Sequence, residues 1–200
     1  MEKQIMNEKE SLAIITGMLQ ETREYIHKGV GNIQLVWGYL SVIISLCIYF
    51  GLQATSNPWI MMGWWLIPLI GWPVIYRMKR RNPQKIVTIF DKMIKKVWIV
   101  IGITATVAPL LMASNTNDIL FIEAILISIG ITITGLIINF KTLYIPGFVC
   151  IGISFLLLWF NGINQILIFA LLFLVMLIIP GHIINHQANK KISASLCSEN

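Results

Sequence analysis

Charged residues are scarce in this chain of 200 residues. Asp, Glu, Lys and Arg together make up 12% of it, whereas soluble domains carry about 25%. Hydrophobic residues account for 56%, and the mean hydropathy is +0.77. This composition supplies too few polar side chains to cover a water-facing surface. The sequence therefore excludes water-soluble enzyme folds and indicates an integral membrane protein.

Sequence patterns that carry catalysis are also missing. The chain contains no HExxH, GxxxxGK or GxSxG pattern and no paired acidic metal motif. We therefore predict that the protein is not an enzyme and holds no cofactor. Its three cysteines, Cys47, Cys150 and Cys197, form no CxxC pair, so we expect reduced thiols rather than a disulfide framework.

Long apolar runs account for more than half of the chain. A helix needs about 20 mostly apolar residues to cross about 30 Å of hydrocarbon. Six runs meet this requirement, at residues 33–52, 59–76, 97–113, 119–138, 143–160 and 166–184. Their apolar character is continuous rather than alternating, so they predict an all-α, integral membrane bundle of six transmembrane helices.

The basic residues all lie on one side of this predicted topology. The 15 Lys and Arg residues occur before the first span, in the loop 77–96, just after the fourth span, and in the tail 185–200. The loops on the other side, 53–58, 114–118 and 161–165, contain none. The positive-inside rule therefore predicts that both termini are cytoplasmic. The net charge of +6 then indicates contact with membrane lipids, and we expect no nucleic-acid partner.

Two segments outside the spans carry amphipathic patterns. Residues 1–32 predict a cytoplasmic amphipathic helix that ends at Gly29 and Gly31. Its acidic balance favours packing on the bundle or docking to a protein partner over adhesion to anionic lipid. Residues 77–96 predict a basic extension of the third span that reaches the headgroup region. A specific anionic-lipid site is the alternative, with contacts from Arg77, Lys79, Arg80, Arg81 and Lys85.

Three spans end in similar sequences. Residues 135–139 read GLIIN, residues 181–185 read GHIIN, and the second span ends in GWPVIY at residues 71–76. Either three helical hairpins repeat in parallel along the chain, or short matches arise by chance in a restricted alphabet. Both interpretations stay open. Parallel repeats would differ from the inverted repeats common in secondary transporters.

Small residues predict where helices pack closely, because they let backbones approach each other in lipid. They occur in the third span (Gly102, Thr106), the fourth (Gly130) and the fifth (Gly147). We therefore expect spans three to five to form the tight centre of the bundle. The sixth span, 166–184, consists mainly of large aliphatic residues, so we expect it to face lipid or a second protomer.

Glu123 is the only carboxylate inside a predicted span. A charge in hydrocarbon costs a few kcal/mol or more, so such a residue is a candidate proton or ion site. Glu123 also lies only five residues after Asp118, about 7.5 Å along a helix. It could therefore reach the membrane interface instead, and both placements stay open.

Two further groups of residues allow a structural and a functional interpretation. His182 and His186 lie four residues apart near the end of the sixth span. This spacing can bind a metal, but it is also typical of interfacial histidines near a helix C-terminus. Aromatic and proline residues of the second span predict either a pocket or a kink with packing aromatics: Trp64, Trp65, Pro68 and Trp72.

Three short motifs remain: KESLAII at residues 9–15, the turn from Thr134 to Lys141, and IPGH at residues 179–182. Together they resemble a family of small multi-span inner-membrane proteins of Bacteroidetes-type bacteria. The resemblance implies a bacterial cytoplasmic (inner) membrane protein. It carries over no functional residue, because that family has no assigned activity.

Two functions are compatible with these observations. The first is a non-enzymatic membrane protein that acts by association, as a regulator, scaffold or complex subunit. Its partner would bind through residues 1–32 or 77–96, or would be a second copy of the chain. The alternative is a small transporter or channel that uses Glu123. We favour association, because the spans contain few polar groups with which to line a transport path.

Overall fold

The fold was obtained as a computed structural model, which describes residues 8–55, 57–81, 89–111, 118–160 and 162–198. Within these ranges the side chains of residues 8–30, 89–91, 188–189 and 191–198 are not described. Every regular element in the described part of the chain is helical: α1 (Glu8–Thr55), η1 (Pro58–Trp65), α2 (Leu66–Arg81), α3 (Ile89–Leu111), α4 (Ile119–Ile138), α5 (Lys141–Ser154), η3 (Phe155–Leu158), α6 (Asn164–Phe173), η4 (Leu174–Ile178) and α7 (Ile179–Ser198). The prediction of an all-α fold is confirmed for these residues.

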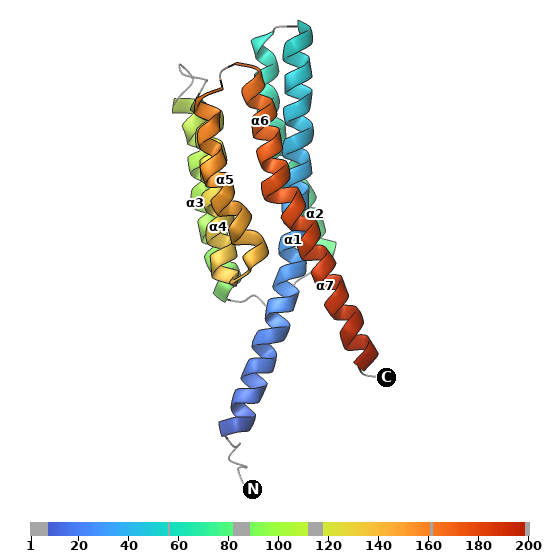
Figure 1. The fold of residues 1–200 in the computed structure, drawn as a ribbon. Helices are drawn as coiled ribbons and strands as arrows, with labels where there is room; N and C mark the ends of the chain where they lie inside the picture. Colours follow the sequence, from blue (N-terminus) through green and yellow to red (C-terminus); the bar gives the residue numbers. More distant parts are fainter. Residues whose placement is uncertain (1–7, 56, 82–88, 112–117, 161, 199–200) are drawn as a thin grey trace.

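Six helical stretches of the described residues are long and apolar enough to cross a membrane, which is the predicted number. They are Gly31–Thr55, Pro58–Arg81, Lys92–Leu111, Ile119–Ile138, Lys141–Leu158 and Asn164–Gln187. Each coincides with a predicted span to within a few residues, except that the second and third extend by about five residues at the end that faces the basic loop. The N-terminal end of α1 and the C-terminal end of α7 leave the bundle on the same side (Figure 1).

The helices form two groups that lie side by side (Figure 1). In the first group, α1 packs on α2, α6 and α7. In the second, α4 packs on α3 and, most extensively, on α5. The main hydrophobic core lies between the groups, where large side chains of α6 to α7 such as Phe169, Phe173 and Met176 meet Ile131 and Cys150. Large side chains, rather than close backbone contact, therefore join the two groups.

The chain's last span is the most buried of the six, so the prediction that it faces lipid or a second protomer is wrong. In its most apolar 18-residue window, 56% of the residues are buried, against 6% in the corresponding window of α3. The reason lies partly on α1, where glycines admit the last helix: a Cβ added at Gly38 would lie 2.9 Å from Leu177 Cβ. The prediction that the third span belongs to the tight centre is also wrong, because α3 is one of the two least buried spans.

The first helix continues through Gly29 and Gly31 without a break, so the prediction that an amphipathic helix ends there is wrong. α1 is one helix of 48 residues. Glycine lowers helix propensity by only about 1 kcal/mol, which the packed bundle can offset. Gly31 instead admits α7, since an added Cβ would collide with the Asn185 side chain. The amphipathic face predicted for residues 1–32 lies on side chains outside the described residues.

The two most similar span ends, GLIIN at residues 135–139 and GHIIN at residues 181–185, have different structures. After α4 the chain turns sharply, with Asn139 in the left-handed conformation (φ 55°). The Phe140 amide donates to the Gly135 carbonyl at 2.9 Å and the Asn139 amide to the Leu136 carbonyl at 3.1 Å, which is the hydrogen-bond pattern of a Schellman helix end. The matching Asn185 lies inside α7, which continues to Ser198. The hairpin repeat stays a prediction.

Candidate functional site

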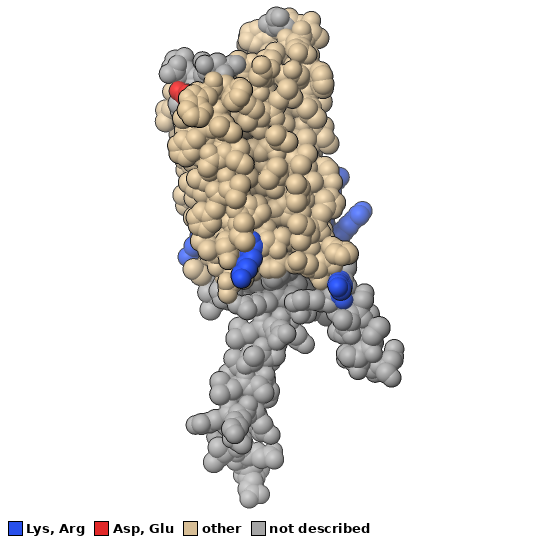
Figure 2. All heavy atoms as spheres, in the orientation of Figure 1, with Lys and Arg blue, Asp and Glu red and all other residues tan. Residues whose placement is uncertain are grey.

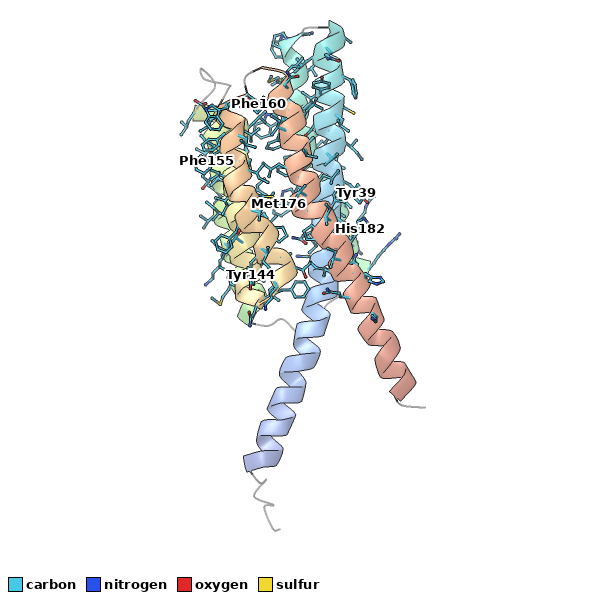
Figure 3. The ribbon with its side chains drawn as sticks, in the orientation of Figure 1. Tyr39, Tyr144, Phe155, Phe160, Met176 and His182 are labelled. Atoms are coloured by element: carbon cyan, nitrogen blue, oxygen red, sulfur yellow. The ribbon has the colours of Figure 1, made fainter. Side chains whose placement is uncertain are left out.

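Two polar contacts link α1 and α7 near the basic end of the bundle. The Tyr39 hydroxyl and His182 Nε2 are hydrogen-bonded at 2.7 Å, and the two rings meet edge to face with centroids 5.9 Å apart (Figure 3). About one helical turn nearer to the termini, Asn185 Nδ2 donates to Asn32 Oδ1 at 2.7 Å. Both pairs join side chains that are far apart in the sequence, so they align α1 with α7.

Within the described residues the two histidines of α7 have different surroundings. His182 is occupied by Tyr39, and His186 is exposed on the next turn of α7. No group of three or more His, Cys, Asp or Glu side chains comes together in the described part of the chain. The structure therefore brings together Tyr39 and His182, a pair that the sequence did not suggest, instead of the two histidines.

Glu123 lies on the face of α4 that turns toward α3. It shares this face with Gly130, against which Ile101 packs, and with Thr134, which accepts a hydrogen bond from Trp98 Nε1 at 3.1 Å. The residue is half-buried. Its Oε1 atom is buried and has no hydrogen-bond partner among the described residues. Gln34 Oε1 and Asn185 Oδ1 share this property, but Glu123 is the carboxylate among the three, and an unpaired carboxylate costs more to bury than an amide.

The aromatic residues of the second span do not converge. Trp64 packs edge to face on Phe169 of α6, with ring centroids 5.3 Å apart. Trp65, Pro68 and Trp72 are exposed on the outer side of η1 and α2. The four residues thus divide between the core and the outer surface of the protomer.

Basic side chains gather at one end of the molecule (Figure 2). Arg77, Lys79, Arg80 and Arg81 are exposed in the last turns of α2, while Lys85 lies outside the described residues. Lys141, at the start of α5, lies at the same end. This distribution has the form that the positive-inside rule describes.

The faces of α2 and α3 that point away from the bundle are almost entirely uncovered. Among the described residues, α3 makes its extensive contacts with α4 alone. Gly102 and Thr106, four residues apart, lie exposed on its outer side. A Cβ added at Gly102 would meet no atom within 4 Å. The sequence pointed to these small residues as contacts within the bundle, but the structure leaves them open.

Comparisons with known proteins add no relative: no family model, curated protein or solved structure matches the chain. The resemblance to small multi-span inner-membrane proteins therefore stays an expectation.

Proposed function

We propose that this protein is a non-enzymatic, multi-pass protein of the bacterial cytoplasmic membrane that acts by association with another membrane protein or a second copy of itself. The observation that carries the proposal is the open face of α3 around Gly102 and Thr106. The placement of both termini in the cytoplasm is supported by the basic residues at one end of the bundle.

Small residues on an outer face matter because of how helices associate in lipid. Lipid chains are as apolar as leucine, so association depends on close backbone approach and dense packing. Gly102 offers such an approach. The Thr106 hydroxyl donates to the Gly102 carbonyl at 2.7 Å, and the Thr104 hydroxyl to the Val100 carbonyl at 3.0 Å. Their polar groups are thus satisfied within α3, and a partner helix can bury this face without stranding a donor.

Gly102→Leu tests the proposal directly. A Cβ added at Gly102 meets no described atom within 4 Å, so we expect the fold to stay intact while the approach of a partner helix is blocked. We expect the tagged variant to lose its stoichiometric partner, or to fall from oligomer to monomer, in pull-down and light-scattering measurements in mild detergent.

Gly152→Leu is the matched control, because a Cβ at Gly152 of α5 also meets no atom within 4 Å. It should leave the complex intact. A wild-type protein that is monomeric and without a partner in native membranes would contradict association, as would equal complexes in all three proteins.

Transport through Glu123 is the second candidate. The buried, unpartnered Oε1 atom of this residue favours it, because an intramembrane carboxylate that can take up a proton or cation is a common element of transport paths. Against it, two hydroxyls of α4 point away from Glu123 and supply no path from it: Ser128 faces Met176 and Thr132 faces Gly147 of α5. Both also donate to carbonyls of their own helix, at 2.7 and 2.8 Å.

A further inference from the structure

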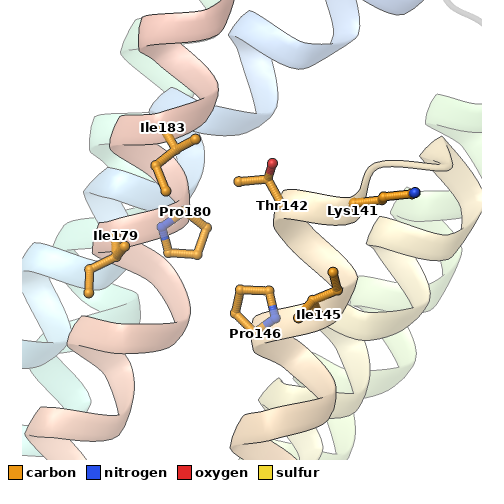
Figure 4. Close-up of a pocket in the computed structure, with 7 residues that line it drawn as sticks. All are labelled: Lys141, Thr142, Ile145, Pro146, Ile179, Pro180 and Ile183. Atoms are coloured by element: carbon orange, nitrogen blue, oxygen red, sulfur yellow. The ribbon is translucent and has the colours of Figure 1, made fainter.

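A cavity opens between α5 and α7 at the basic end of the bundle. Its volume is about 290 Å³. Lys141 and Thr142 line its basic end, and five apolar residues line the rest. Figure 4 shows Pro146 of α5 and Pro180 of α7 on facing sides of this space. The cavity is therefore a shallow, open apolar groove with polar groups at one end, called the slot below.

A second cavity follows the same boundary toward the opposite end of the molecule. It has a volume of about 250 Å³ and lies between α5–η3 and α6–η4. All eight lining residues are hydrophobic, from Cys150 to Phe160 on one side and from Ile168 to Val175 on the other. The two cavities together mark a seam that runs along most of the length of the sixth span.

The seam is hollow because of how the two helix groups meet. Among the described elements, α5 makes far fewer contacts with α6 and α7 than with α4. Large buried side chains such as Phe173 and Met176 keep the groups joined at the centre. The two cavities lie along this boundary on either side of that central contact.

The charged side chain that lines the slot among the described residues is basic. Lys141 is the first residue of α5, and its amine is directed away from α7 (Figure 4), so the ammonium group stands beside the slot rather than inside it. Thr142 adds a hydroxyl donor. The helix dipole of α5 has its positive end at the same place. An occupant that matches the seam has a long apolar part and an anionic head.

We propose that the seam between α5 and α6–α7 binds one anionic phospholipid, with an acyl chain along the apolar cavities and the phosphate group at Lys141 and Thr142. This site differs from headgroup contacts along α2. Its apolar walls hold the acyl chain, and Lys141 and Thr142 hold the headgroup. The inference rests on membrane insertion, but it does not depend on the proposed association or on the face of α3.

Native mass spectrometry of the full chain tests the site. The protein in mild detergent is titrated with phosphatidylglycerol or phosphatidylcholine, and retained lipids are counted per protomer. We expect one retained lipid, with phosphatidylglycerol preferred. Lys141→Gln should lower this preference about fivefold, as expected for one basic residue at an anionic surface. Lys79→Gln, which removes an exposed charge at the end of α2, should leave it unchanged.

A second variant separates chain binding from charge. Ile145→Trp fills the slot and should abolish retention of both lipids, whereas Leu136→Trp, on the exposed side of α4, should not. Equal preference in wild type and Lys141→Gln would overturn the proposal, as would the same fall in Lys79→Gln. Wild-type retention by Ile145→Trp would also overturn it. Loss of the complex in Gly102→Leu with lipid retention intact would show that the two proposals are independent.

Discussion

At the scale of single residues, polar groups in the spans are mostly satisfied by their own helix. Ser45, Thr132 and Ser154 each donate to the carbonyl four residues earlier, at 2.7 to 2.8 Å. Three buried side-chain oxygens have no partner among the described residues, those of Gln34, Asn185 and Glu123, and Glu123 is the carboxylate among them. The sequence identified Glu123 as unusual, since charge inside an apolar run is visible in the sequence. It could not reveal that the residue faces α3, because that depends on packing.

Glu123→Gln separates the two candidate functions. The amide keeps the shape of the side chain, removes its charge and replaces one oxygen by an N–H donor, and Glu123 does not lie on the open face of α3. We therefore expect the assembly state to be unchanged and the free energy of unfolding to be equal or higher, because a neutral amide costs less to bury without a partner than a carboxylate does. Light scattering and thermal unfolding in detergent measure both.

Flux measurements in reconstituted vesicles complete this test, with Asp118→Asn as a control that removes a carboxylate five residues away. A proton or cation flux in wild type that disappears only in Glu123→Gln would favour transport over association.

At the scale of helices, hydropathy located all six spans but could not rank them by burial. The membrane solvates large aliphatic residues as well as a protein core does, so the Leu- and Ile-rich sixth span gave the same signal as a lipid-facing helix. Its central place is set by small residues elsewhere, such as Gly38 on α1. Conversely, Gly102 predicted that the third span packs closely inside the bundle, yet in the structure the face of α3 that carries Gly102 is uncovered.

The turn between α4 and α5 gives a stability prediction at this scale. A Cβ at Gly135 would lie 2.6 Å from the Tyr144 backbone nitrogen, so α5 must shift to accept it. We expect Gly135→Ala to destabilise the protein by about 1–3 kcal/mol, as overpacking does. Gly152→Ala, in open space, should be neutral or stabilising by up to about 1 kcal/mol, because Ala is the better helix former. Thermal unfolding of the two variants in the same detergent measures this difference in stability. Equal melting temperatures would contradict the close contact at Gly135.

At the scale of the whole molecule, both helix groups carry their described basic side chains at the same end of the bundle, which gives the molecule an electrostatic polarity. This polarity was predictable, because Lys and Arg placement is a property of the sequence. The division into two groups was not, since it depends on which side chains fill the boundary, such as Met176, whose sulfur lies 3.1 Å from Ser128 Oγ.

The orientation predicts which positions a membrane-impermeant thiol reagent reaches in intact cells. In a variant without native cysteines, Thr55→Cys at the end of α1 should be labelled from outside. Lys79→Cys at the basic end should be labelled only after permeabilisation. Both positions are exposed, so accessibility reports the side of the membrane. The reverse pattern would contradict cytoplasmic termini.

The unbroken course of α1 has a mechanical consequence. At 1.5 Å per residue its 48 residues measure about 72 Å, more than twice the hydrocarbon thickness of about 30 Å. The part before Gly31 is about 35 Å long, and it continues the axis of a span locked to α7 without a hinge. A change of about 10° in the tilt of that span therefore moves the far end by about 6 Å. As one continuous helix, α1 would act as a lever arm, turning a small change of tilt within the bilayer into a displacement at its far end.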